Sequence, residues 1–198
     1  MGLQIQDGSG NSYLASVDVN NRLRTFAITE PDVDNASELG NSYNYNTGVI
    51  SLTSSNTSAV FYIKNNDETP IIVPTLFYLL GNSTGGSGDV LITVLRNPTT
   101  GTIIDNAIDM EMAGVNRNFG SSKSLLTDSY KGAEGNTFTN GDKVIESIFN
   151  QSPTRAAISV GAVVVPRGSS IGIEITPAAG NTSLDVEFAA SVYIRSTS

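Results

Sequence analysis

Apolar and polar residues alternate along much of this chain with the two-residue period of β-strands. The pattern is clear in YLASVDVNNRLRTFAIT (residues 13–29), where every second residue from Tyr13 to Val19 is apolar. Asn20 and Asn21 tolerate the positive φ that a tight turn needs, and a return strand follows with apolar residues on both of its faces. The segment is therefore predicted to be a β-hairpin arm.

An acidic segment, EPDVDNASELGNS (residues 30–42), follows the predicted arm. It has little apolar content and contains a proline and a glycine, which favours a linker or surface loop. Asp32, Asp34 and Glu38 also suggest a calcium loop, but the dense oxygen ligands and the turn glycine of an EF-hand are missing. We therefore expect residues 1–40 to be an arm and an acidic linker.

The remainder, residues 41–198, contains further strand patterns separated by turn residues. In SIGIEITP, Ile171, Ile173 and Ile175 share one face. Pro74 marks an edge, a bulge or a strand start, and NSTGGSG (residues 82–88) is predicted to be a flexible connection. The expected strands cover residues 58–65, 71–81, 89–96, 157–166, 170–177 and 183–194.

The stretch from about 105 to 154 is different, because much of it is polar and rich in glycine. NAIDMEMAG (residues 106–114) could form a short helix, with Ile108 and Met112 one turn apart. We expect the whole stretch to be a long surface excursion, which usually indicates function or contact with a neighbour.

Several strands without alternating helices predict an all-β protein. Long strands joined by long, irregular connections favour a jelly-roll-like β-sandwich over a meander. The predicted organisation is an N-terminal β-hairpin arm followed by this sandwich over residues 41–198.

The composition narrows the possible functions. The chain has 198 residues and a formal net charge of −8, with only 11 Lys and Arg, so a nucleic-acid-binding surface is not expected. There is no run of about 20 apolar residues, and the N-terminus MGLQIQDGSG has no signal-peptide pattern, so neither a membrane span nor a signal peptide is expected.

The residues most used in catalysis are missing. The sequence has no histidine and no cysteine, which removes the Ser-His-Asp triad, histidine-bound metals and thiolate zinc sites. A carboxylate pair remains, with Glu111, Glu134, Glu146 and Glu174 as candidates, but spacing singles out none of them. We expect no enzyme activity, no metal and no cofactor.

Sugar binding is a further possibility, because jelly rolls often present aromatic platforms. Tyr43, Tyr45 and Tyr130 are the tyrosines that could be exposed, although core or turn packing is the favoured interpretation for them.

Several segments resemble virion proteins of tailed bacteriophages. The N-terminal segment from Gly8 to Thr25, which contains GSGNSYLASVDVNNRLRT, is similar to the opening of several such proteins. Later segments are similar in kind to head-decoration and minor structural proteins. These are NPTTG, VNRNFGSSKSL, SYKGAEG and VVVPRGSSIGIEITPAAGNTSLDVEFAASVYI.

The resemblance implies a non-enzymatic capsid decoration or cement protein, synthesised in the host cytoplasm and located in the virion. It implies a homo-oligomer, with a trimer expected, that binds the major capsid protein or other virion proteins. A neck, tail or baseplate component and a carbohydrate- or receptor-binding module are the alternatives. The hairpin arm is the expected partner-binding element, through Leu14, Val17, Val19, Arg22, Leu23, Arg24, Phe26 and Ile28.

Overall fold

The computed structural model of the protein describes residues 32–106, 111–150 and 154–194. The chain divides into two compact units, Met1–Pro31 and Asp32–Ser198, and the described residues all belong to the second. The predicted hairpin arm, with all of its expected partner-binding residues, lies outside the described residues, so its role stays a prediction.

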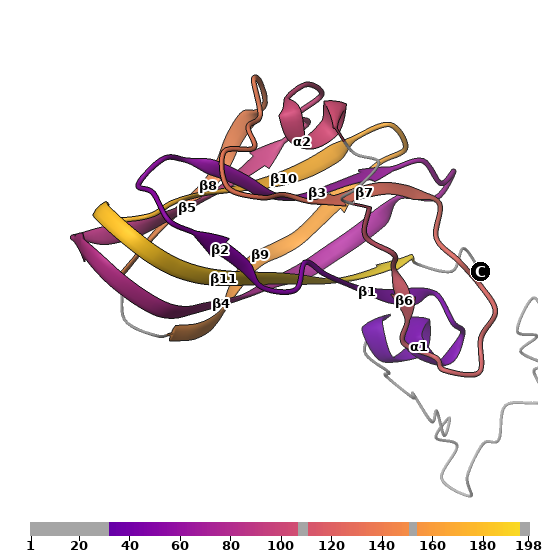
Figure 1. Ribbon diagram of the computed structural model, residues 1–198. Coiled ribbons are helices and arrows are strands. Elements are labelled where there is room, and N and C mark those ends of the chain that lie inside the picture. Colours follow the sequence, from indigo (N-terminus) through magenta and orange to yellow (C-terminus); the bar gives the residue numbers. More distant parts are fainter. Residues whose placement is uncertain (1–31, 107–110, 151–153, 195–198) are drawn as a thin grey trace, which may run out of the picture. The chain divides into compact units, whose positions relative to one another are not determined.

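The second unit is built from two antiparallel sheets (Figure 1). The six-stranded sheet has the order β6-β1-β11-β4-β9, with β2 also paired to β11. Its strands are β1 (Ser42–Asn46), β2 (Ile50–Leu52), β4 (Ile71–Ser87), β6 (Val115–Asn116), β9 (Thr154–Val165) and β11 (Ala179–Ile194). The five-stranded sheet has the order β7-β3-β10-β5-β8. Its strands are β3 (Ser58–Asn65), β5 (Asp89–Arg96), β7 (Thr127–Lys131), β8 (Asp142–Asn150) and β10 (Ser170–Thr176).

The strand order is that of a jelly roll. Setting aside the short strands β2, β6 and β7, four strands remain in each sheet, in the orders β1-β11-β4-β9 and β3-β10-β5-β8. The chain crosses between the sheets at every connection except the long one from β5 to β8. The predicted all-β, jelly-roll-like sandwich is therefore confirmed for this unit.

The core lies between the two sheets. It is formed by the apolar residues that alternate with polar ones along the strands and therefore share the inner face. Ile171, Ile173 and Ile175 of β10 all point into it, as predicted. On the facing sheet, alternate residues of β11 from Leu184 to Val192 are buried against them. Burial of these apolar side chains is the main force that holds the two sheets together.

One strand prediction needs correction, and another is confirmed. The NSTGGSG segment is not a flexible connection, because β4 continues through it to Ser87 and pairs with the start of β11. Gly85 and Gly86 have positive φ, and the pairing has register shifts there, so the glycines allow an irregular strand. Pro74 lies at a bulge in β4, opposite a register shift in β9, which is one of the three predicted roles.

The stretch expected to be one surface excursion, residues 105–154, contains three strands. β6 extends the six-stranded sheet, while β7 and β8 form the two edges of the five-stranded sheet. The sequence did not reveal them because β6 has two residues and the outward residues of β7 and β8 are polar or mixed. Ile108 of the predicted short helix lies outside the described residues; Met112 is buried in the core.

The segment expected to be a linker contains a helix, α1 (Asp32–Glu38). Val33 and Ala36 lie one turn apart and pack on Ile72 and Tyr193, on the outer face of the six-stranded sheet. The acidic residues at its start suit a helix N-terminus, and Gly40 has the positive φ that ends a helix.

A second short helix, α2 (Thr102–Asp105), covers the outer face of the other sheet (Figure 1).

Among the described residues, two buried side chains, Ser42 and Tyr78, carry an unpaired hydroxyl, and Tyr78 lies in the core. The Tyr78 hydroxyl is buried among Phe149 and Phe188 and has no hydrogen-bond partner within the described part of the chain. Leaving a buried hydroxyl unpaired costs about 1–3 kcal/mol. We therefore expect Tyr78→Phe to raise the free energy of unfolding by about 1 kcal/mol, measured by thermal and urea denaturation.

The matched control is Tyr45→Phe, because the Tyr45 hydroxyl hydrogen-bonds to Thr127 Oγ1 at 2.9 Å. This substitution should lower the free energy of unfolding by about 1 kcal/mol. If Tyr78→Phe destabilised the protein as much as Tyr45→Phe, the Tyr78 hydroxyl would have a partner and the interpretation would be wrong.

Candidate interaction surfaces

The two side edges of the sandwich are covered to different extents. At one edge, the chain between β6 and β7 passes from one sheet to the other, and Leu125 in this connection packs against the core. The hydrogen bond between Tyr45 of β1 and Thr127 of β7 joins the two sheets there. At the opposite edge, β8 pairs only with β5 and β9 only with β4 among the described strands. We call β8 and β9 together the open edge.

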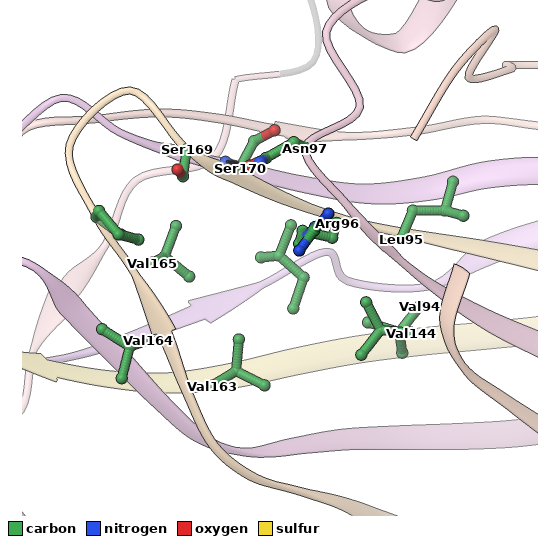
Figure 2. Close-up of a pocket in the computed structure, with 12 residues that line it drawn as sticks. Val94, Leu95, Arg96, Asn97, Val144, Val163, Val164, Val165, Ser169 and Ser170 are labelled. Carbon is green, nitrogen blue, oxygen red and sulfur yellow. Dashed lines mark hydrogen bonds between the residues drawn. The ribbon is translucent and has the colours of Figure 1, made fainter. Parts of the chain in front are cut away.

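A cavity of about 150 Å³ lies at the open edge, between the two sheets. Figure 2 shows the valines of β9 on one side of it and Val94 with Val144 on the other. Val144 lies at a β-bulge, because Val94 pairs with Ile145 and Leu95 pairs with Lys143, which leaves Val144 without a partner on β5. We call this cavity, lined by Val94, Val144, Val163, Val164 and Val165, the valine groove.

Three polar residues around the valine groove, Arg96, Asn97 and Ser170, already have partners. Asn97 Oδ1 accepts a hydrogen bond from the Ser170 backbone N–H, and Ser170 Oγ donates to the Pro98 carbonyl. The Arg96 guanidinium forms an ion pair with Asp142 at 2.6 Å. Because these groups bind one another, the groove offers an apolar wall and suits an apolar occupant.

The second notable surface is a loop that caps helix α1. We call residues 116–123 the capping loop. The carbonyls that follow the end of a helix have no partner within the helix, and side chains of this loop supply donors to them. Asn118 Nδ2 donates to the Glu38 carbonyl at 2.8 Å, Lys123 Nζ to the Leu39 carbonyl at 2.8 Å and Asn116 Nδ2 to the Gly40 carbonyl at 2.9 Å.

The capping loop is also held by its own hydrogen bonds. Asn116 Oδ1 accepts from the Asn118 backbone N–H, and Asn118 Oδ1 accepts from the Gly120 N–H. A Cβ atom at Gly40 would collide with Ser121, so the helix end and the loop fit closely. Phe119 stands at the tip of this loop with 95% of its surface exposed.

The large exposed apolar residues mostly gather at these two surfaces. Near the capping loop and its connections lie Leu39, Val115, Phe119 and Leu126; at the open edge lie Val144, Ile148 and Val164. Val49 and Phe77 lie elsewhere, on the outer side of the six-stranded sheet. Sequence reasoning missed both surfaces, because it could not tell which apolar residues of β8, β9 and the loop stay outside the core.

The tyrosines proposed as a sugar platform are mostly in the core. Tyr43 and Tyr45 are 2% and 1% exposed, which confirms the packing interpretation for them. Tyr130 is half-buried and stacks on Tyr62, with ring centroids 5.7 Å apart. Neither Tyr43 nor Tyr45 is therefore available to stack on a sugar.

The candidate carboxylates have different partners. Among the residues whose side chains the structure describes, no group of three acidic side chains is placed to hold a metal ion. Glu134 accepts hydrogen bonds from Thr53, and Glu146 pairs with Lys143 at 2.9 Å.

Neither helix of the described part has the length and apolar character of a membrane span.

Comparisons with known proteins give little further information. No family model matches the chain, and no curated protein matches it. Among solved structures, a chain from the structure of infectious bursal disease virus, Gx strain, is 12% identical, with a TM-score of 0.22. The match covers 79% of this chain and 30% of the other, so this chain spans under a third of that chain's length. A TM-score this low supports no conclusion about fold or function.

Glu174 provides a pH-dependent probe of the outer face of the five-stranded sheet. Partial burial raises the pKa of its carboxyl, opposed by a hydrogen bond from the Phe138 backbone and by the charge of Lys143. Because the folded state binds this proton more tightly than the unfolded state does, the contribution of Glu174 to stability falls as pH rises above the ordinary glutamate pKa of about 4.3. We expect Glu174→Gln to flatten this fall, measured by urea denaturation across that pH range.

The control for this experiment is Glu68→Gln, since the Glu68 side chain is 89% exposed in its ion pair with Arg167. The flattening should be smaller in this variant than in Glu174→Gln. An unchanged pH profile in Glu174→Gln would contradict the assignment.

The capping loop predicts a local effect of Asn116→Ala. The variant loses donors to the Gly40 and Lys123 carbonyls and an acceptor for Asn118, which should cost about 1–3 kcal/mol. Hydrogen exchange should increase in peptides covering α1, since the end of the helix loses part of its cap. Asn140→Ala is the matched control, because Asn140 organises another loop, around Thr99. Equal exchange of α1 in both variants would show that the cap does not hold the helix.

Proposed function

We propose that this chain is a non-enzymatic virion structural protein of a tailed bacteriophage, a capsid decoration or cement protein. The observation that carries the proposal is the pair of exposed apolar surfaces at opposite edges of the sandwich. Exposed apolar patches of this kind mark protein–protein interaction sites. The described residues show no metal cluster beside them, and the sequence has no histidine or cysteine.

The position of α1 supports the proposed role of the N-terminal arm. The helix is the first described element after residues 1–31, and both its packing on the sheet and its cap hold it in place. The capping loop belongs to VNRNFGSSKSL, one of the segments that resemble phage virion proteins.

The proposed mechanism is multivalent binding. Each copy contributes arm contacts to the shell and apolar contacts to neighbouring copies. Linked contacts that are weak individually give high avidity, because each later contact forms at a high effective concentration. The net charge of −8 limits nonspecific sticking between particles.

The test is binding to purified phage heads that lack this protein, measured by co-sedimentation. Val17→Asp with Val19→Asp places charges at positions predicted to share the apolar face of the arm and should abolish binding. Ser12→Asp with Ser16→Asp adds the same charge to polar positions of the same segment and should retain binding. Equal binding by both double variants would refute the role of the arm. Binding to tails or necks, with none to heads, would replace the decoration role with the alternative.

A further inference from the structure

Phe119 has the properties of a preformed anchor for another molecule. It is 95% exposed, although its loop is held by side-chain and backbone hydrogen bonds on both sides of it. An aromatic side chain on an already ordered loop loses little conformational entropy when it binds. Aromatic residues are also enriched where protein surfaces meet.

The valine groove has a size that suits the Phe119 ring. Its volume is about 150 Å³, and an apolar cavity of about 150 Å³ in another protein stays dry and binds benzene. Asn97, Ser170 and Arg96 beside it already have partners. A phenyl ring would therefore replace water on the valines without taking these partners away.

The loop and the groove lie at opposite edges, so they can meet only between two copies. The capping loop follows β6 at one edge of the six-stranded sheet, and the groove lies against β9 at the other. The strands β1, β11 and β4 lie between them, a separation of about 19 Å at the usual strand spacing. A contact between opposite edges is heterologous, and repeating it produces a closed ring or an open chain.

Charge does not oppose this contact. The segment RNFGSSK (residues 117–123) carries Arg117 and Lys123 and no carboxylate. The charged side chain that lines the groove, Arg96, is paired with Asp142, so the cationic loop approaches a neutral pair there.

We propose that Phe119 of one copy inserts into the valine groove of a second copy and so joins the chains head to tail. The inference deepens the proposed function and rests on it, because it names the contact between copies that multivalent binding requires. Its test is nevertheless made in solution, without phage particles.

The first experiment measures self-association of the full chain by sedimentation velocity over a wide concentration range. Phe119→Ala should weaken association about tenfold or more, as for a central interface residue. Because Phe119 is exposed, the unfolding temperature should not change. The matched control is Phe77→Ala, which removes another phenylalanine, 46% exposed on the outer face of β4, and should leave association unchanged.

The second experiment blocks the groove. Val144→Asp places a charge in it at a position that is 52% exposed, so the core is not disturbed; Val49→Asp, at a position 66% exposed on another surface, is the control. Only Val144→Asp should prevent assembly. Mixing Phe119→Ala with Val144→Asp should then give a one-to-one dimer that grows no further, because one intact loop meets one intact groove.

Several results would overturn the inference. These are a wild-type chain that is monomeric at every concentration, a Phe119→Ala variant that assembles normally, and a mixture that stays monomeric. Loss of assembly in Val144→Asp but not in Phe119→Ala would mean that another segment occupies the groove. If the wild-type chain does not bind heads while the loop and groove variants behave as expected, the proposed function fails and the head-to-tail contact stands.

Discussion

The structure depends on the burial of two facing sets of alternate apolar residues. Ile171, Ile173 and Ile175 of β10 face the inward residues of β11, and both strands lie inside their sheets. Because the side chains of a strand alternate between faces, a shift of one residue would move every one of these groups to solvent. This requirement fixes how the strands pair with their neighbours, and therefore which strands lie at the edges of the two sheets.

Burying the inner faces leaves the sandwich with two edges to protect. The chain closes one of them itself, through the connection between β6 and β7 and the Tyr45–Thr127 hydrogen bond. At the other edge, the bulge at Val144 and the ion pair between Arg96 and Asp142 surround an apolar groove. Bulges and charged residues are common at sheet edges, where they limit uncontrolled pairing with other chains. A groove in such an edge can still accept one side chain of matching shape.

The capping loop connects the first helix of this unit with the closed edge. Its asparagines and Lys123 use their side-chain donors for the carbonyls at the end of α1. Once these polar side chains are engaged with the helix, the one large apolar residue of the loop, Phe119, is left facing solvent. The interactions that hold α1 therefore also present the residue that we infer to join two copies.

The sequence by itself determined the class of fold and most of its strands, because a two-residue period of apolar residues is a local property. It placed β3 and β5 at their observed bounds and the three isoleucines of β10 on one face. The absence of histidine and cysteine likewise narrowed the chemistry without any structure.

Only the tertiary structure decided which apolar residues remain outside the core. α1 has just two apolar residues that pack, and its cap comes from residues about 80 positions later in the chain. The glycine-rich end of β4 is a strand only because β11 pairs with it. Phe119 and Val144 are apolar in the sequence like any core residue, and their exposure follows from a distant hydrogen-bonded cap and a bulge at a sheet edge. Such features depend on contacts between distant segments, which a local pattern does not contain.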